Sequence, residues 1–105
     1  MATNDDTTLV ALAQAGDKEA FGTLVNRYHP MALRIAGRLI ANRDVARELA
    51  QEALLHAYLS LNRLRDTTRF ESWLCGIVLN VCRDHLRSQH EDYASLETLT
   101  RRSTA

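Results

Sequence analysis

The feature that most constrains the fold is the largely apolar run at residues 70–87, FESWLCGIVLNVCRDHLR. One face at helical three-and-four spacing is formed by Phe70, Trp73, Leu74, Ile77, Val78 and Val81. A second apolar stripe, rotated by about a quarter turn at about 100° per residue, is formed by Cys75, Leu79, Cys82 and Leu86. Because a helix that is apolar around most of its circumference must be covered by other elements, this run is predicted to be the central helix. We expect functional residues on its narrow polar edge, which carries Ser72, Gly76, Asn80, Arg83 and Arg87, with Asp84 beside it.

The composition predicts one all-α domain with a modest core. The chain has 105 residues, 46% of them hydrophobic, and a single proline. No apolar run approaches the ~18 residues that span a bilayer, and the start lacks a basic-then-apolar signal, so we expect a soluble cytoplasmic protein without membrane association. The formal net charge is zero, so bulk charge does not indicate a nucleic-acid partner.

The two cysteines predict neither a disulfide nor a metal site. Cys75 and Cys82 lie seven residues apart on one expected helix, which separates their Cα atoms by about 10.5 Å, beyond disulfide reach. Cys82 with His85 supplies only half of a metal ligand set. We interpret both thiols as small core side chains in a reducing compartment, and we expect no metal or other cofactor.

The first part of the chain predicts a short helix followed by a long one. Asp5-Asp6-Thr7-Thr8 caps the short helix, Gly16 ends it, and its apolar stripe consists of Leu9, Leu12 and Ala13. Asp17 caps the next helix, whose apolar spacing keeps its phase through Pro30 to Leu39, so we expect one helix kinked near His29-Pro30. Its arginines form a stripe that is either a solvated face or a phosphate-facing one: Arg27, Arg34 and Arg38.

The next helix, capped by Asn42 to Asp44 and running to about Arg63, has two contrasting faces. Small side chains suited to close packing form one face: Ala46, Ala50, Ala53, Ala57, Leu61 and Leu64. Nearly opposite lie Glu48, Gln51, Glu52, Leu55 and Leu59. Leucines beside glutamates on a face turned away from the core are typical of a partner surface. The alternative is that Leu55 and Leu59 lie under the N-terminal segment.

The remaining segments are polar. Leu64 to Arg69 is a short connector rich in hydroxyls and arginine, and Ser88 to Ala105 is predicted to be a polar linker or tail with at most a brief helical turn. The sequence offers no glycine-rich phosphate loop, activated nucleophile or paired carboxylates, so it does not predict an enzyme. A helix-turn-helix reader is disfavoured because the run 70–87 exposes too few polar side chains to base edges. Aromatics, an amide and a polar loop close together suit unpaired nucleic acid instead.

At this point the residues are similar to a known family. The runs DVARELAQEALLHAYLSLNRL, RDTTR and FESWLCGIVLNVCRDHLRS, with EAFGTLVNRYHPMALRIAGRLI upstream, together resemble region two of the extracytoplasmic-function class of bacterial sigma factors. The similarity covers roughly Asp17 to Ser88. Its most specific parts are Glu48-Leu49 with Gln51-Glu52, Phe70-x-x-Trp73-Leu74, Asn80, and Asp84-x-Leu86-Arg87.

The resemblance implies a compact bundle of three main helices plus a short leading one, and two binding surfaces. Core RNA polymerase, through the clamp helices of its largest subunit, would be bound by Glu48, Gln51, Glu52 and Leu55, with Leu59 on the same ridge. The non-template strand of the upstream promoter element would be bound and opened by Arg63, Arg65, Thr67, Thr68, Arg69, Phe70, Trp73, Asn80, Arg83 and Arg87. By analogy a flipped base would enter a pocket built by Leu64 to Arg69 with Asn80 nearby.

The chain also departs from the family pattern. Basic or aromatic side chains are usual where this chain has Glu71, Cys75, Gly76, Leu79 and Ser88, and an acidic one is common at Arg47. Each lost phosphate contact weakens DNA binding, so we expect poor DNA affinity for the chain alone. The family's second, helix-turn-helix domain is expected after residues 89–105; the chain is either an excised domain or a short form. An anti-sigma factor is a plausible partner, and the alternative function is a sigma-like protein-interaction module with weak or lost DNA contact.

Overall fold

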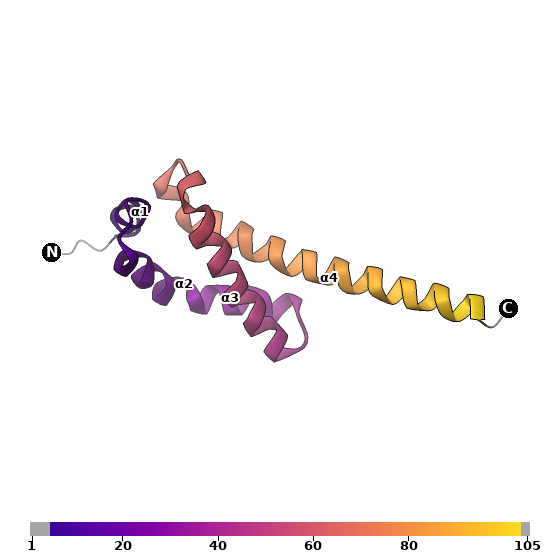
Figure 1. Cartoon of the computed structure of the whole chain (residues 1–105). Helices are drawn as coiled ribbons and strands as arrows, with labels where there is room; N and C mark the ends of the chain where they lie inside the picture. Colours follow the sequence, from indigo (N-terminus) through magenta and orange to yellow (C-terminus); the bar gives the residue numbers. More distant parts are fainter. Residues whose placement is uncertain (1–4, 104–105) are drawn as a thin grey trace.

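The computed structural model describes residues 5–103, and the side chains of residues 5–100. The described chain is all-α (Figure 1), which confirms the predicted fold class. The α-helices are α1 (Asp6–Gln14), α2 (Lys18–Leu39), α3 (Arg43–Ser60) and α4 (Phe70–Ser103). Two short 3₁₀ helices, η1 (Leu61–Arg63) and η2 (Thr67–Arg69), lie in the link between α3 and α4.

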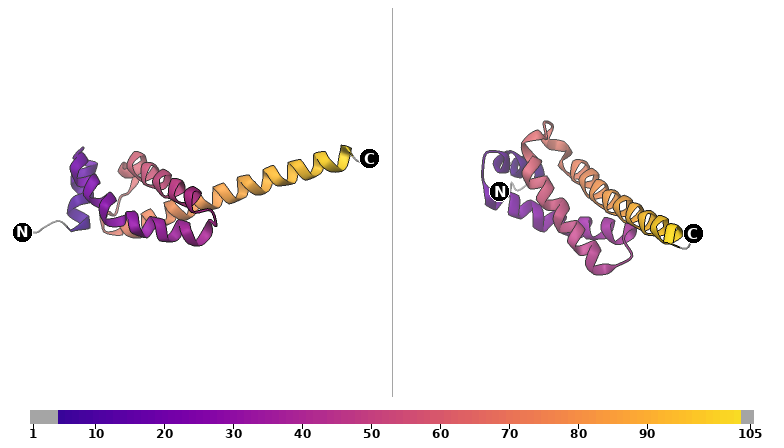
Figure 2. Two further views of the ribbon diagram at one scale, coloured as in Figure 1. Left: turned by 90° about the horizontal axis from the view of Figure 1, so that it is seen from below. Right: turned by 45° about the vertical axis from the view of Figure 1, so that its right-hand side comes forward.

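The core lies where α2, α3 and the first half of α4 pack against one another. The second half of α4 extends away from this body as a lone rod (Figures 1 and 2), so the described chain measures 71 × 25 × 19 Å. Helix α1 packs across the start of α2 and also contacts η2. Among residues 5–103, no helix is both long and apolar enough to cross a membrane.

Helix α1 begins and ends as the sequence predicts. The side chain of Asp5 accepts a hydrogen bond from the backbone N–H of Thr8 at 2.8 Å, which satisfies a free donor of the first turn. Gly16, with φ of 107°, makes the left-handed turn that ends the helix, a conformation that glycine adopts without steric cost. The predicted apolar stripe is partly wrong, because Val10 is fully buried while Leu12 is 45% exposed.

Helix α2 passes through Pro30 without ending, as its unbroken apolar phase predicted. The bend expected at His29-Pro30 stays a prediction. A polar cluster ties α2 to α1: Arg27 Nη1 donates to Asp6 Oδ1 at 2.6 Å, and Tyr28 Oη donates to Asp6 Oδ2. All three arginines of the predicted basic stripe, Arg27, Arg34 and Arg38, are exposed, and Arg27 is paired with Asp6.

Helix α3 shows the two faces that its sequence predicts. The Asn42 side chain caps its first turn by accepting from the N–H groups of Asp44 and Val45 at 2.9 and 3.1 Å. The alanine face is buried in full, comprising Ala46, Ala50, Ala53, Ala57, Leu61 and Leu64. Small side chains on this face let α3 approach α2 and α4 closely. The α-helix ends at Ser60, and η1 continues the turn to the predicted limit at Arg63.

Helix α4 differs from expectation in two ways. Its buried side chains lie on one side, namely Phe70, Leu74, Val78, Val81 and Cys82, and Leu86 of the second stripe is 40% exposed. The body therefore covers one side of α4 rather than surrounding it. The helix also runs on to Ser103, where a linker with at most a brief helical turn was expected. Residues 89–100 are all exposed, so this part is helical without packing against the body.

Candidate functional site

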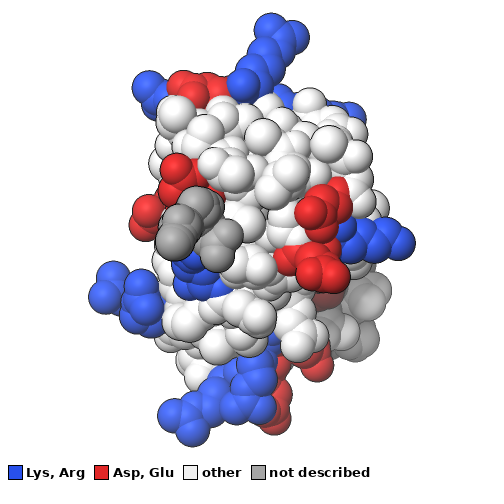
Figure 3. Space-filling view, turned by 90° about the vertical axis from the view of Figure 1, so that its left-hand side faces the viewer, with Lys and Arg blue, Asp and Glu red and all other residues white. Residues whose placement is uncertain are grey.

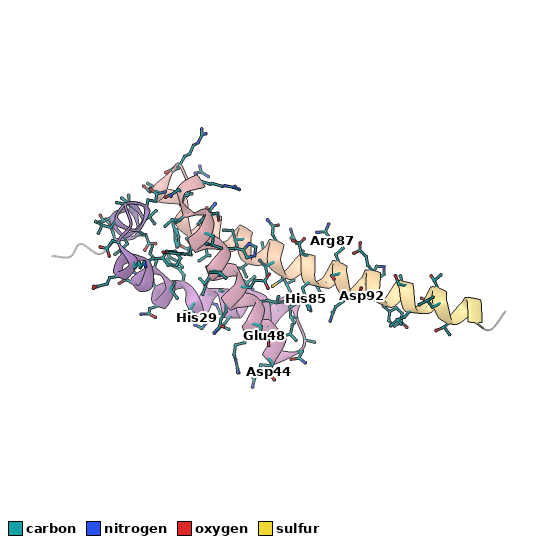
Figure 4. The ribbon with its side chains drawn as sticks, in the orientation of Figure 1. His29, Asp44, Glu48, His85, Arg87 and Asp92 are labelled. Atoms are coloured by element: carbon teal, nitrogen blue, oxygen red, sulfur yellow. The ribbon has the colours of Figure 1, made fainter. Side chains whose placement is uncertain are left out.

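The outer face of α3 is an exposed ridge of acidic and apolar side chains. Leu55 is 55% exposed and Leu59 73%, and Glu48, Gln51 and Glu52 are exposed beside them. Figure 4 labels Glu48 on α3. The alternative that the N-terminal segment covers Leu55 and Leu59 is therefore wrong. We call this set of five residues the α3 ridge.

Contacts within the monomer cover little of the α3 ridge. His56 Nε2 lies 3.7 Å from Glu52 Oε2, a loose exposed contact. The neighbouring Tyr58, 42% exposed, packs its ring on Phe21 with centroids 5.0 Å apart. Leucines this exposed leave apolar area in water that a partner can bury.

The connector between α3 and α4 is built by local caps and by one distant side chain. Asp66 Oδ1 accepts from the backbone N–H of Thr68 at 3.0 Å and from its hydroxyl at 2.5 Å, which forms η2. These bonds, first the one from the Thr68 hydroxyl, lower the pKa of the Asp66 carboxyl. From α1, Gln14 Nε2 donates to the carbonyls of Leu61 and Leu64 at 3.0 and 2.8 Å.

A shallow hollow of about 370 Å³ lies where the connector meets α4. It is lined by Thr68, Arg69, Glu71, Ser72 and Cys75. The pocket predicted for a flipped base, built by residues 64–69 with Asn80 nearby, stays a prediction. Asn80 is exposed almost three turns into α4, about 15 Å along the axis from Phe70, and does not line the hollow.

Most of the predicted nucleic-acid residues are exposed, as that role requires. They are Arg63, Arg65, Thr68, Arg69, Asn80, Arg83 and Arg87, with Thr67 and Trp73 partly buried. Phe70 is the exception and is a correction: it is 2% exposed and packs between the rings of Tyr28 and Trp73, at centroid distances of 5.5 and 5.9 Å. A ring held inside the core cannot stack on a base in this conformation.

Several of the arginines already have acidic neighbours. Arg69 Nε lies 3.4 Å from Asp66 Oδ2, and Arg87 pairs with Asp84 one turn earlier on α4. Figure 4 marks Arg87 on the exposed part of α4. Seen end-on from the side of α1 and the connector, the surface is largely uncharged, with basic side chains projecting at its edges beside acidic ones (Figure 3). Because acidic side chains lie beside the arginines, the surface attracts phosphate groups less strongly than unpaired arginines would.

The described residues hold no group of three or more metal-ligating side chains. Both cysteines are free thiols, Cys75 half-buried and Cys82 buried, and burial raises the pKa of Cys82. The imidazole Nε2 of His29 on α2 is buried without a hydrogen-bond partner, and His85 lies on α4 (Figure 4).

Comparison with known proteins decides the family. The sequence model described as "Sigma-70 region 2" matches residues 24–91, more than half of the chain. This chain belongs to the sigma-70 region 2 family. The matched segment runs from within α2 to the middle of α4, so it contains the α3 ridge and the connector and leaves α1 outside. Sigma-70 region 2 domains are not enzymes, in agreement with the sequence-based prediction.

The relatives are extracytoplasmic-function sigma factors. The RNA polymerase sigma-H factor of Pseudomonas aeruginosa is 37% identical over 81 residues, 77% of this chain and 42% of that protein. The ECF RNA polymerase sigma-E factor of Escherichia coli K12 is 34% identical over 84 residues, 80% of this chain and 44% of that protein. The chain thus spans less than half the length of these relatives.

A solved structure shares the fold of this region 2 domain. It is titled as the NMR structure of an engineered region 2 of sigmaE in complex with GTAAAA. The TM-score is 0.77 at 32% identity, and the match covers 88% of this chain and 97% of that one. This likeness confirms the predicted bundle with its short leading helix.

Sequence reasoning missed two residues that shape the connector. Gln14 was not singled out, because nothing in a linear sequence indicates a hydrogen bond to carbonyls 47 and 50 residues away. Asp66 could have been found, since an aspartate two residues before a threonine is a common turn-forming pattern. Neither residue binds a partner in our reading of the site; both fix the backbone that does.

Proposed function

We propose that this chain binds core RNA polymerase and helps to recognise and open the upstream promoter element. The observation that carries the proposal is the likeness to an engineered region 2 that is in complex with GTAAAA. Within this role the α3 ridge docks on the clamp helices of the largest polymerase subunit. The connector and the exposed side of α4 bind the non-template strand.

The α3 ridge supports the polymerase half of this proposal by its chemistry. Leu55 and Leu59 offer apolar area for an interface centre, and Glu48, Gln51 and Glu52 offer a polar rim that selects a partner with basic side chains. Because all five residues are exposed, substitutions on the ridge should change binding more than the stability of the monomer.

The connector and α4 support the nucleic-acid half. Thr68 and Arg69 line a hollow that is open to solvent, and Trp73 is partly exposed within a turn of it. Opening stacked duplex costs about 1.4 kcal/mol per step, and each stacking contact to an unpaired base returns about 1–3 kcal/mol. A few contacts at this surface therefore offset local opening once polymerase has brought the domain to the promoter.

A second function has its own support. Glu71 and Cys75 line the hollow where basic or aromatic side chains are usual, and Arg69 and Arg87 are engaged by aspartates. These features favour a protein-interaction module, for example one that binds an anti-sigma factor, with weak DNA contact. Forked promoter DNA, offered with and without core polymerase, separates the two: polymerase-dependent DNA binding supports the first function, and polymerase binding without DNA engagement supports the second.

The test of the α3 ridge is Leu55→Glu. We expect polymerase binding to be abolished while helicity and melting temperature stay nearly unchanged, because Leu55 is 55% exposed. The matched control is Leu96→Glu on α4, since Leu96 is 64% exposed and lies outside the family match. Pull-down with core polymerase and circular dichroism measure both. Marked unfolding of the first variant, or equal loss of binding in both, would refute this assignment.

The test of the α4 surface is Asn80→Ala, with Asn26→Ala as the exposed control on α2. Loss of one base contact, about 1–3 kcal/mol, predicts a drop in promoter opening of about fivefold or more while polymerase affinity is kept. Permanganate footprinting reads the opening. Equal loss of opening and polymerase binding would remove Asn80 from the nucleic-acid surface.

We further propose that residues 1–88 form the working domain, that residues 89–105 join it to a following domain, and that the protein acts in the cytoplasm, where the polymerase is. Family membership supports the cytoplasmic location. The exposure of residues 89–100 supports the division into a working domain and a joining segment.

A further inference from the structure

Gln14, the last residue of α1, bridges two carbonyls of the connector. Its Nε2 donates to the carbonyl of Leu61 at 3.0 Å and to that of Leu64 at 2.8 Å. A side-chain amide nitrogen carries two hydrogens, so it can satisfy both acceptors at once. The side chain is partly buried, which shields these bonds from competition by water.

These carbonyls lie where the chain leaves α3. The last carbonyls of a helix have no partner within it and need another donor. Leu61 O also accepts from the N–H of Leu64 at 3.1 Å, whereas the described donor to Leu64 O is Gln14 alone. Gln14 therefore binds the carbonyls at the two ends of η1, the turn that follows α3, and fixes the direction in which the connector starts.

Helix α1, which carries Gln14, is itself held in place by contacts with the rest of the domain. At its other end Asp6 is bound by Arg27 and Tyr28 of α2, and between the two ends Leu9 and Val10 are buried. Helix α1 also packs against η2. Helix α1 thus supports the connector, while the side chains of Thr68 and Arg69 stay exposed.

We propose that Gln14 is a positioning residue for the nucleic-acid surface: it holds the connector in its binding conformation before a strand arrives. The inference rests on the proposed function, in which Thr68 and Arg69 contact an unpaired strand. A loop that is ordered in advance loses less conformational freedom when it binds. Gln14 lies outside the matched family segment, and in this proposal it acts through the connector backbone.

The decisive variant is Gln14→Leu in the whole chain, which keeps the bulk and removes both donated bonds. The control is Gln89→Leu, the same chemical change at an exposed position of α4. With single-stranded GTAAAA as the probe, in the presence of core polymerase, we expect Gln14→Leu to bind about three- to tenfold more weakly, because ordering the loosened connector on binding costs about as much as one net hydrogen bond. Polymerase affinity and the control variant stay unchanged. Gln14→Lys, whose ammonium can donate to both carbonyls, restores at least half of the loss.

A spectroscopic readout separates positioning from general stability. In Gln14→Leu the carbonyl carbon resonances of Leu61 and Leu64 shift, and amides of residues 64–69 exchange faster, while those of α2 and α3 do not. Unchanged oligonucleotide affinity despite a loosened connector overturns the proposal, as does an unchanged connector. If the natural chain binds no oligonucleotide even with polymerase, the proposed function fails, and the resonances still report separately whether Gln14 holds the connector.

Discussion

The two halves of α4 share one secondary structure and differ in almost everything that stabilises it. From Phe70 to Cys82 the helix buries a row of side chains against α2 and α3. From Arg83 to Thr100 its side chains are almost all exposed, and the Asp84–Arg87 ion pair in this part is local. The contrast teaches that helical geometry and tertiary support are separate properties. Helices of about 12–15 residues that stand alone are only marginally stable in water.

The largest expected loss of stability comes from shortening a buried side chain in the packed half of α4. Leu74 is fully buried, so Leu74→Ala removes its contacts and leaves a cavity, at a cost of about 2–5 kcal/mol in the free energy of unfolding. Leu96→Ala in the exposed half should change this free energy by less than about 0.5 kcal/mol. Urea denaturation measures both. A similar loss of unfolding free energy in both variants would show that the two halves of α4 do not differ in tertiary support.

A smaller effect is expected from Tyr28→Phe, which keeps the ring contact with Phe70 and removes the hydrogen bond to Asp6. We expect a loss of about 1–2 kcal/mol, because the acceptor is charged and the contact is half-buried. The matched change in the exposed half, Asp84→Ala, should cost less than about 0.5 kcal/mol.

The pH dependence of Tyr28→Phe sharpens this prediction. Burial first, and the hydrogen bond to Asp6 second, raise the pKa of Tyr28 above its ordinary value of 10.0. A raised pKa in the folded state gives stability that is complete below pH ~10 and is lost as pH rises further through the folded pKa. The stability gap between the natural chain and Tyr28→Phe should therefore narrow above pH ~10. A constant gap in thermal melts up to pH ~11 would exclude this contribution.

The smallest expected effect on stability is that of deleting residues 89–105. Because residues 89–100 are exposed, the free energy of unfolding should fall by less than about 0.5 kcal/mol, while the helical circular dichroism signal decreases. Amides of residues 89–100 should also exchange much faster than those of residues 74–82. A large drop in melting temperature would mean that the distal half supports the body after all.

The sequence predicted the buried faces of the helices better than the point at which the last helix ends. The two faces of α3 were predicted correctly, because burial of an alanine face follows from helical period alone. The continuation of α4 was not predicted, because the polarity of residues 88–105 favours a linker. The absence of glycine and proline there, together with helix-favouring leucine, glutamate and arginine, was the available signal for a helix.

The candidate site was predicted less completely. Phe70 was assigned to the nucleic-acid surface from its place in the family motif, although its helical spacing with Leu74 and Val78 puts it on the apolar face. The buried position of Phe70 follows that spacing and not the motif. The hollow lacks Asn80, since a continuous helix carries that side chain away from the connector. Gln14 depends on contacts between distant segments, which no local pattern encodes.

The different burial of the two thiols has a practical consequence. Reaction with maleimide requires a thiolate that the reagent can reach, so buried Cys82, whose pKa is raised, should stay unlabelled while half-buried Cys75 reacts. Cys75 lines the hollow beside Thr68 and Arg69. A fluorophore attached there would sit at the edge of the proposed strand-binding surface, and its emission would signal the arrival of a strand in real time.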